Sequence, residues 1–206
     1  MHRLLRACVA ACLLMVVPVS TASAAVGGPT NVYIADASFT FIARGVEWSG
    51  NIHVADDRLS GVVRESVFFD NQGPERVCFA GTPDEFLSND TTEFFGQQFR
   101  GDASVRDDLS SARMQFTATG QKVTVDGCTG EVVSSKAERH AFDAKLTGTG
   151  EITVETSETV IELPDGTLVP ATSTTSSRAA DGKVEVDKIN AVVTDASLFH
   201  GVTLPN

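Results

Sequence analysis

Three histidines are the side chains of this 206-residue sequence best suited to general acid–base chemistry. His53 falls on the polar face of an alternating segment, beside Glu47 and Asn51, whereas His140 falls in phase with the apolar face at the start of another segment. His200 stands near the C-terminus. No Gly-x-Ser-x-Gly nucleophile elbow accompanies them, and sequence spacing alone does not assemble a triad from distant residues. We therefore predict a non-enzymatic role without catalytic residues; the alternative is a secreted hydrolase that uses His53 or His140 with nearby acids.

Oxygen-rich side chains gather in the segment 82–100. Asp84, Asn89, Asp90 and Glu93 are hard ligands of the kind that Ca²⁺ prefers, but their spacing is also that of helix caps. Thr82-Pro83-Asp84-Glu85 has the form of a capping box with proline at the first helical position, and Asp90 to Glu93 forms a weaker one. The sequence contains no His-Glu-x-x-His or paired Cys-x-x-Cys. We predict a short helical insertion near 82–100, no metal site and no cofactor.

The same segment is rich in phenylalanine. Phe86, Phe94, Phe95 and Phe99 crowd a stretch without clear strand alternation. They could line a rim over an apolar pocket or a patch for a protein partner. They could instead plug the open end of a β core, and exposed aromatic patches are uncommon on monomers. We predict that these four phenylalanines are the binding residues of the protein.

The first 25 residues have the pattern of a secretory signal peptide. Two arginines precede an apolar run that ends in small residues, which places cleavage after Ala24 or Ala25. The run is too short for a membrane span of roughly 20 residues. Cys78 and Cys128 are then the two cysteines that remain, and in an oxidising compartment they have one intramolecular pairing available. The sequence therefore predicts a secreted, extracellular protein with one disulfide.

Charge excludes two classes of partner. The sequence has 16 lysines and arginines against 27 acidic residues, for a formal net charge of −11. The predicted cleavage removes two of those arginines and makes the chain more acidic. A surface this acidic repels phosphate backbones and anionic lipid heads. Trp48 is the only tryptophan and falls in phase with an apolar face, so we expect it to be buried. We predict no nucleic-acid partner and no membrane span; the partner is an unidentified small molecule or protein.

Period-2 alternation of apolar and polar residues dominates the rest of the sequence and is typical of half-buried strands. It is clearest in residues 46–54, 112–118 and 142–146. Leu163-Pro164-Asp165-Gly166 has the composition of a hairpin turn, and phase slips near Ser157 and Asp187 suggest β-bulges.

These patterns predict an all-β, antiparallel, hairpin-connected β-barrel of about ten strands, with a β-sandwich as the alternative. In domain terms, residues 1–25 are the signal peptide, 26–31 a flexible segment and 32–206 a single β domain. The predicted function is a secreted, non-catalytic β module that binds an apolar small molecule or a protein partner at the Phe-rich 82–100 segment.

Overall fold

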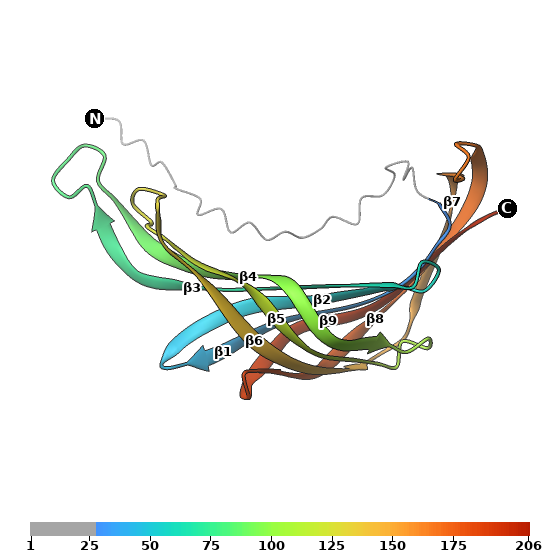
Figure 1. Cartoon of the computed structure of the whole chain (residues 1–206), viewed down its shortest axis with the longest axis horizontal. Coiled ribbons are helices and arrows are strands. Elements are labelled where there is room, and N and C mark those ends of the chain that lie inside the picture. The colour runs from blue at the N-terminus through green and yellow to red at the C-terminus, as the bar shows by residue number, and fades with distance from the viewer. Residues whose placement is uncertain (1–27) are drawn as a thin grey trace.

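The computed structural model describes residues 28–206 of the chain, and regular structure in that range consists of nine long antiparallel strands (Figure 1). The predicted signal peptide, residues 1–25, lies outside the described residues. Between residues 28 and 206 there is no helix with the length and apolar character that a membrane crossing requires. The strands are β1 (Thr30–Ala43), β2 (Val46–Asp57), β3 (Val62–Cys78), β4 (Phe86–Val105), β5 (Ser111–Val125), β6 (Val132–Gly148), β7 (Thr153–Glu162), β8 (Leu168–Val186) and β9 (Ile189–Pro205).

The pairing of these strands confirms the all-β antiparallel prediction. Each of β1 to β5 pairs with the next strand, β9 pairs with both β1 and β8, and β6 pairs with β8. Eight strands are thereby linked in a ring. The ring is uneven, because β6 and β8 pair only between Phe142–Gly148 and Ala180–Val186, whereas β5 and β6 pair along almost their whole lengths. β7 stands outside the ring and pairs with β8 alone.

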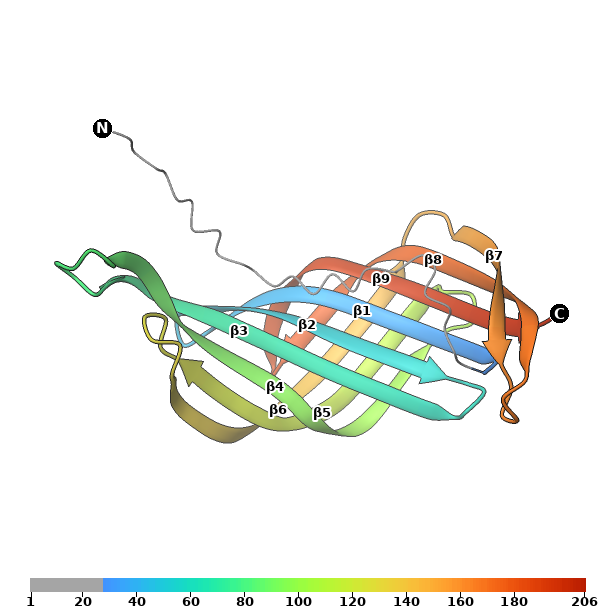
Figure 2. The same ribbon diagram turned by 90° about the horizontal axis from the view of Figure 1, so that it is seen from above.

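Two hairpins extend beyond the ring at opposite ends of the molecule. The ends of β3 and β4 rise at one end, and β7 with the adjoining part of β8 rises at the other (Figure 1). Seen from above, β5 and β6 pass beneath β1 and β2 (Figure 2). The space between these crossing strands is filled by the apolar core.

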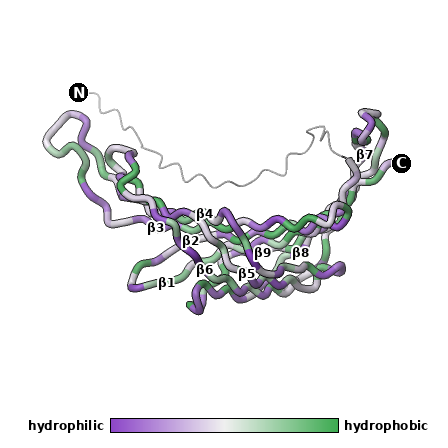
Figure 3. Tube along the Cα trace, viewed as in Figure 1, coloured by the Kyte–Doolittle hydropathy of each residue, from purple (hydrophilic) through white to green (hydrophobic). Residues whose placement is uncertain are grey.

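Apolar and polar residues alternate along the strands, as the colouring by hydropathy shows (Figure 3). This alternation decides which side chains enter the core. Trp48 is buried as predicted, and His53 is more exposed, on the opposite face of β2. The inward positions of β5 and β6 are those that the sequence pattern indicated. The fully buried large side chains include Phe39, Ile52, Phe94, Leu109, Met114, Phe142, Leu146 and Leu198.

Turn chemistry explains where the strands reverse. Leu163–Gly166 forms the predicted β7–β8 turn, in which Gly166 donates its N–H to the Leu163 carbonyl and Asp165 accepts from the Thr167 N–H. Asp187 and Lys188 both have positive φ and form the two-residue β8–β9 turn, as the right-handed twist of hairpins favours. The predicted bulge near Asp187 is therefore wrong, because the phase slip marks a turn. The bulge predicted near Ser157 is also wrong, since β7 pairs with β8 in continuous register.

The predicted helical insertion near 82–100 is wrong as well. Residues 79–85 form a tight loop, in which Glu85 accepts a hydrogen bond from the Gly81 N–H at 2.7 Å. The capping-box residues thus close a hairpin. From Phe86 onward the chain is β4, flanked by β3 on one side and, from Thr91, by β5 on the other. Two neighbouring ladders satisfy its backbone groups, and such tertiary pairing overrides weak local helix signals.

Candidate functional site

The structure separates the four phenylalanines that the sequence grouped into one site. Phe94 points inward and is 0% exposed, whereas its neighbour Phe95 points outward and is 43% exposed. Phe86 is exposed near the hairpin end, and Phe99 packs against the core. Because successive strand residues face opposite sides, the four side chains do not form one surface.

Phe94 and Phe95 have different neighbours for the same reason. The Phe94 ring lies 4.8 Å from the ring of Phe69 and 4.7 Å from that of His140, centre to centre. The Phe95 ring lies 4.9 Å from Phe68 on the outer side of β3. Phe94 is therefore a core residue, whereas Phe95 and Phe86 are exposed.

An apolar surface does occur at the end of the β3–β4 hairpin, where we define the tip surface as Val77, Phe79, Phe86 and Leu87. All four side chains are exposed, Phe79 by 50% and Leu87 by 59%. Val77 and Leu87 are cross-strand partners, and Phe86 is the partner of Cys78, one position further. The Phe79 and Phe86 rings lie 5.8 Å apart. The hairpin end is therefore apolar on both of its faces.

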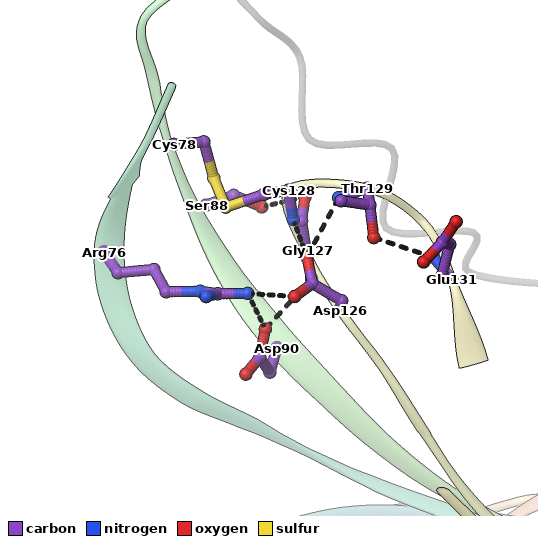
Figure 4. The surroundings of a disulfide bond; sticks show 9 residues. All are labelled: Arg76, Cys78, Ser88, Asp90, Asp126, Gly127, Cys128, Thr129 and Glu131. Carbon is purple, nitrogen blue, oxygen red and sulfur yellow. Dashed lines mark hydrogen bonds and ion pairs between the residues drawn. A yellow bond between two sulfur atoms is a disulfide. The ribbon is translucent and has the colours of Figure 1, made fainter. Parts of the chain in front are cut away.

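A disulfide fastens this hairpin to the loop between β5 and β6, as Figure 4 shows. Cys78 is bonded to Cys128, with 5.4 Å between their Cα atoms, within the range that disulfides require. The predicted pairing is therefore present in the structure. The Ser88 hydroxyl donates a hydrogen bond to the Gly127 carbonyl at 2.8 Å, which adds a second link between β4 and the loop.

Charged groups strengthen the same attachment (Figure 4). One nitrogen of the Arg76 guanidinium donates to Asp90 at 2.7 Å and to Asp126 at 2.6 Å. Asp126 also accepts from the backbone N–H groups of Cys128 and Thr129. The bond from Arg76, followed by those backbone N–H groups, lowers the pKa of Asp126 to about 2. Asp126 thus stays ionised over the physiological range, and the network holds the loop in one conformation.

The three histidines each have a polar partner, but these partners differ in kind. His53 Nδ1 lies 2.7 Å from an Asp36 oxygen on the outer face of the sheet. His200 stacks on Tyr33, with ring centres 4.1 Å apart, and its Nε2 lies 2.9 Å from the Asn31 side-chain oxygen. Among the hydrogen bonds of residues 28–206, none joins a histidine ring to a serine, threonine or cysteine side chain.

His140 has the surroundings that most resemble a catalytic base. Its Nδ1 lies 2.7 Å from an Asp187 oxygen, and its ring packs edge-on against Phe94. Its Nε2 is buried, lies 3.3 Å from a Glu138 oxygen and makes no hydrogen bond within the described residues. Burial would raise the pKa of Glu138, but the charges of Lys122, Lys136 and His140 outweigh it, so this pKa is lowered. The position of a nucleophile beside Nε2 is thus taken by a carboxylate.

Two depressions on the described part of the molecule are open to solvent, and polar and apolar atoms line each of them in similar amounts. One, of about 330 Å³, lies over the ring wall and is lined by charged residues including Arg100, Asp143, Glu185 and Lys188. The other lies at the β4–β5 turn beside Arg106, Asp107 and Asp108. Neither resembles the concave, mostly apolar site that a small apolar ligand requires.

Sequence reasoning did not identify Val77, Phe79, Arg76 or Asp126 as part of a site. Arg76 and Val77 lie on β3, which shifts register against β4 between Gln72 and Glu75, and Asp126 lies in the loop between β5 and β6. The cysteine pair and Phe86 were the sequence signals that pointed to this end of the molecule. No group of three or more histidine, cysteine or acidic side chains in residues 28–206 is arranged to hold a metal ion.

No known family model, curated protein or solved structure matches the chain.

The pKa of His53 yields a test of the outer-face geometry. The hydrogen bond to Asp36 raises this pKa above its ordinary 6.5, although burial opposes the rise. Protonated His53 therefore stabilises the fold fully below pH 6.5, and this contribution disappears as pH rises through the folded-state pKa. We expect Asp36→Asn to lower the His53 pKa in an NMR titration of its ring protons. The ring of His200 should titrate unchanged; a His53 curve that does not move would contradict the assigned pair.

Proposed function

We propose that this chain is a secreted, non-catalytic β module that recognises a protein partner through the tip surface. The observation that carries the proposal is an exposed apolar hairpin end that a disulfide and an ion-pair network link to the β5–β6 loop. Exposed apolar strand ends promote aggregation and are usually blunted by charge or covered. Here the hairpin extends the apolar residues away from the ring instead.

The rigid attachment favours binding in energetic terms. Ordering a loop or a side chain on association costs free energy, so a surface that is already fixed retains more of its interaction energy. Aromatic side chains, phenylalanine among them, are enriched at the core of protein interfaces, and Phe79 and Phe86 are available for this role. A disulfide also suits a protein that acts outside the reducing cytoplasm.

A protein partner is favoured over an apolar small molecule because the ring interior is filled. Phe39, Phe94, Met114, Phe142 and Leu198 are all fully buried in it. The open depressions on the outside are lined by charged side chains. The alternative of a hydrolase receives less support, since His140 faces carboxylates on both ring nitrogens.

The function is tested by comparing two matched double variants as bait for the extracellular proteins of the source organism. Phe79→Ser with Leu87→Ser removes apolar side chains from the tip surface. Ile42→Ser with Val192→Ser removes exposed apolar side chains elsewhere. We expect a partner retained by the wild type and by the second variant to be lost with the first. Equal retention by both variants would refute the tip surface as the binding site.

We also propose that the uneven ring is a closed barrel in solution. The support is the β6–β8 ladder, in which Leu146 is the partner of Gly182. A Cβ at position 182 would lie 2.3 Å from the Lys145 carbonyl oxygen, closer than real Cβ atoms approach.

Gly182→Ala therefore tests the closure. We expect it to lower the free energy of unfolding by about 1–3 kcal/mol, the usual cost of inserting a methyl group into a packed site. Urea denaturation followed by Trp48 fluorescence measures the change. Gly28→Ala is the control, because its nearest neighbour would be an ordinary 3.9 Å away. An unchanged midpoint for Gly182→Ala would favour an open, sandwich-like sheet.

A further inference from the structure

The outer edge of β7 is a second feature of the fold without a partner. β7 pairs with β8 from Thr153 to Glu162 without a register shift, and within residues 28–206 no strand pairs with its other edge. Every second residue of such an edge presents its backbone N–H and C=O outward, ready to accept an added strand. Figure 2 shows β7 outside β8, at the end of the molecule opposite the β3–β4 hairpin.

Within residues 28–206, this edge carries few of the devices that usually protect edge strands, although Gly28 lies near the Glu162 carbonyl oxygen at the end of β7. Natural edges carry lysines, prolines, bulges or covering loops. β7 has no lysine and no proline, and its sequence, Thr-Val-Glu-Thr-Ser-Glu-Thr-Val-Ile-Glu, is rich in the β-branched residues that favour strands. β6 also has an edge that β8 leaves unpaired, in the residues before Phe142. That edge differs from the β7 edge because it carries the basic residues Lys136 and Arg139.

Charge on the β7–β8 hairpin is of one sign. Between residues 149 and 177 the sequence has no lysine, arginine or histidine, and it has five acids: Glu151, Glu155, Glu158, Glu162 and Asp165. The nearest base, Arg178, donates hydrogen bonds to backbone carbonyl oxygens of Leu109 and Gly150. Like charges opposite one another destabilise a strand pair, so these acids disfavour a second copy of β7 at this edge.

We propose that the β7 edge binds an extended, basic segment of a partner protein as an added antiparallel strand. Glu158 and Glu162 lie on one face of β7, and Glu155 lies on the other, because side chains alternate along a strand. A partner strand that places a cation opposite each of them needs basic residues at its first, fifth and eighth positions. The backbone edge supplies hydrogen bonds, and the three carboxylates set the register and exclude acidic or self-pairing strands.

The test uses a synthetic ten-residue peptide of threonine and valine with lysine at positions 1, 5 and 8. We expect salt-dependent binding to the mature protein, measured by isothermal titration calorimetry, and no binding of the same peptide with glutamate in place of lysine. A triple variant, Glu155→Gln with Glu158→Gln and Glu162→Gln, should weaken binding on the order of tenfold, since each cross-strand charge pair contributes modestly. Glu47→Gln with Glu75→Gln and Glu131→Gln makes the same charge change elsewhere and should leave binding unchanged.

Backbone methylation separates strand addition from simple charge attraction. In an added strand, only alternate peptide N–H groups bond to β7, whereas the others point away. Of two lysine peptides, N-methylated at odd or at even positions, one should lose binding and the other should keep it. Equal binding of both, or equal weakening by both triple variants, would overturn the proposal. Because the tip surface lies at the opposite end, the Phe79→Ser, Leu87→Ser variant should bind the peptide normally, so this proposal can fail separately from the proposed function.

Discussion

Phe94→Ala is expected to lower the free energy of unfolding by about 3–5 kcal/mol, the range for a buried phenylalanine. The side chain is fully buried between the rings of Phe69 and His140. Its removal leaves a cavity between strands of a ring that cannot easily collapse, because hydrogen-bonded neighbours hold β4 on both sides. Urea denaturation followed by far-ultraviolet circular dichroism measures the loss.

Phe95→Ala is the matched control for this substitution. It deletes the same atoms one residue further along β4, where the ring faces outward and contacts Phe68. We expect a loss of about 1 kcal/mol, typical of one aromatic contact. If both variants lost equal stability, the inward and outward assignments of β4 would be wrong.

Removing the disulfide by Cys78→Ser with Cys128→Ser is expected to cost up to about 4 kcal/mol. The bond joins residues 50 positions apart, and in the chain-entropy model a loop of that length gives a value of this size. The ion pairs of Arg76 remain, so the native hairpin should still form in the variant. Denaturation with and without reductant measures the contribution in the wild type, and the variant should be insensitive to reductant.

The free-thiol count supplies the control for this experiment. Denatured, unreduced protein produced without residues 1–25 should contain no reactive thiol, whereas two thiols per chain would show that Cys78 and Cys128 do not pair. Hydrogen exchange adds a local measurement. We expect faster exchange at residues 79–88 in the variant, and unchanged exchange near Met114 at the opposite side of the ring. Uniformly faster exchange would mean that the disulfide stabilises the whole ring rather than the hairpin.

Strand alternation made much of the fold predictable. The inward positions of β2, β5 and β6 follow directly from apolar residues at every second place, because one face must be buried and the other wet. The cysteine pair and the 163–166 turn were predictable for similarly local reasons. The pairing of β6 with β8 was not, since nothing local to Phe142–Gly148 or Ala180–Val186 specifies a partner so distant in sequence.

The candidate site was predictable only in part. Phenylalanine content drew attention to residues 82–100, but strand geometry sends Phe94 inward and Phe95 outward. The exposed residues Val77 and Phe79 precede that segment. Val77 pairs with Leu87 across the hairpin, and the Phe79 ring lies next to that of Phe86. The helix signal at Thr82–Glu85 failed because a two-stranded hairpin used the same residues as its turn, a choice made by pairing of the flanking strands.

The pairing of β1 with β9 has a consequence for the order in which this chain folds. Asn31 and His200 are hydrogen-bonded although they lie 169 positions apart, so β1 keeps one open edge until residues 189–205 have been synthesised. Contacts this distant in sequence form slowly, because the entropy of closing a long loop opposes them. The ring therefore closes only after nearly the whole chain is available. Slow closure also leaves strand edges exposed in the meantime, so a chaperone that shields β1 should raise the yield of refolded protein.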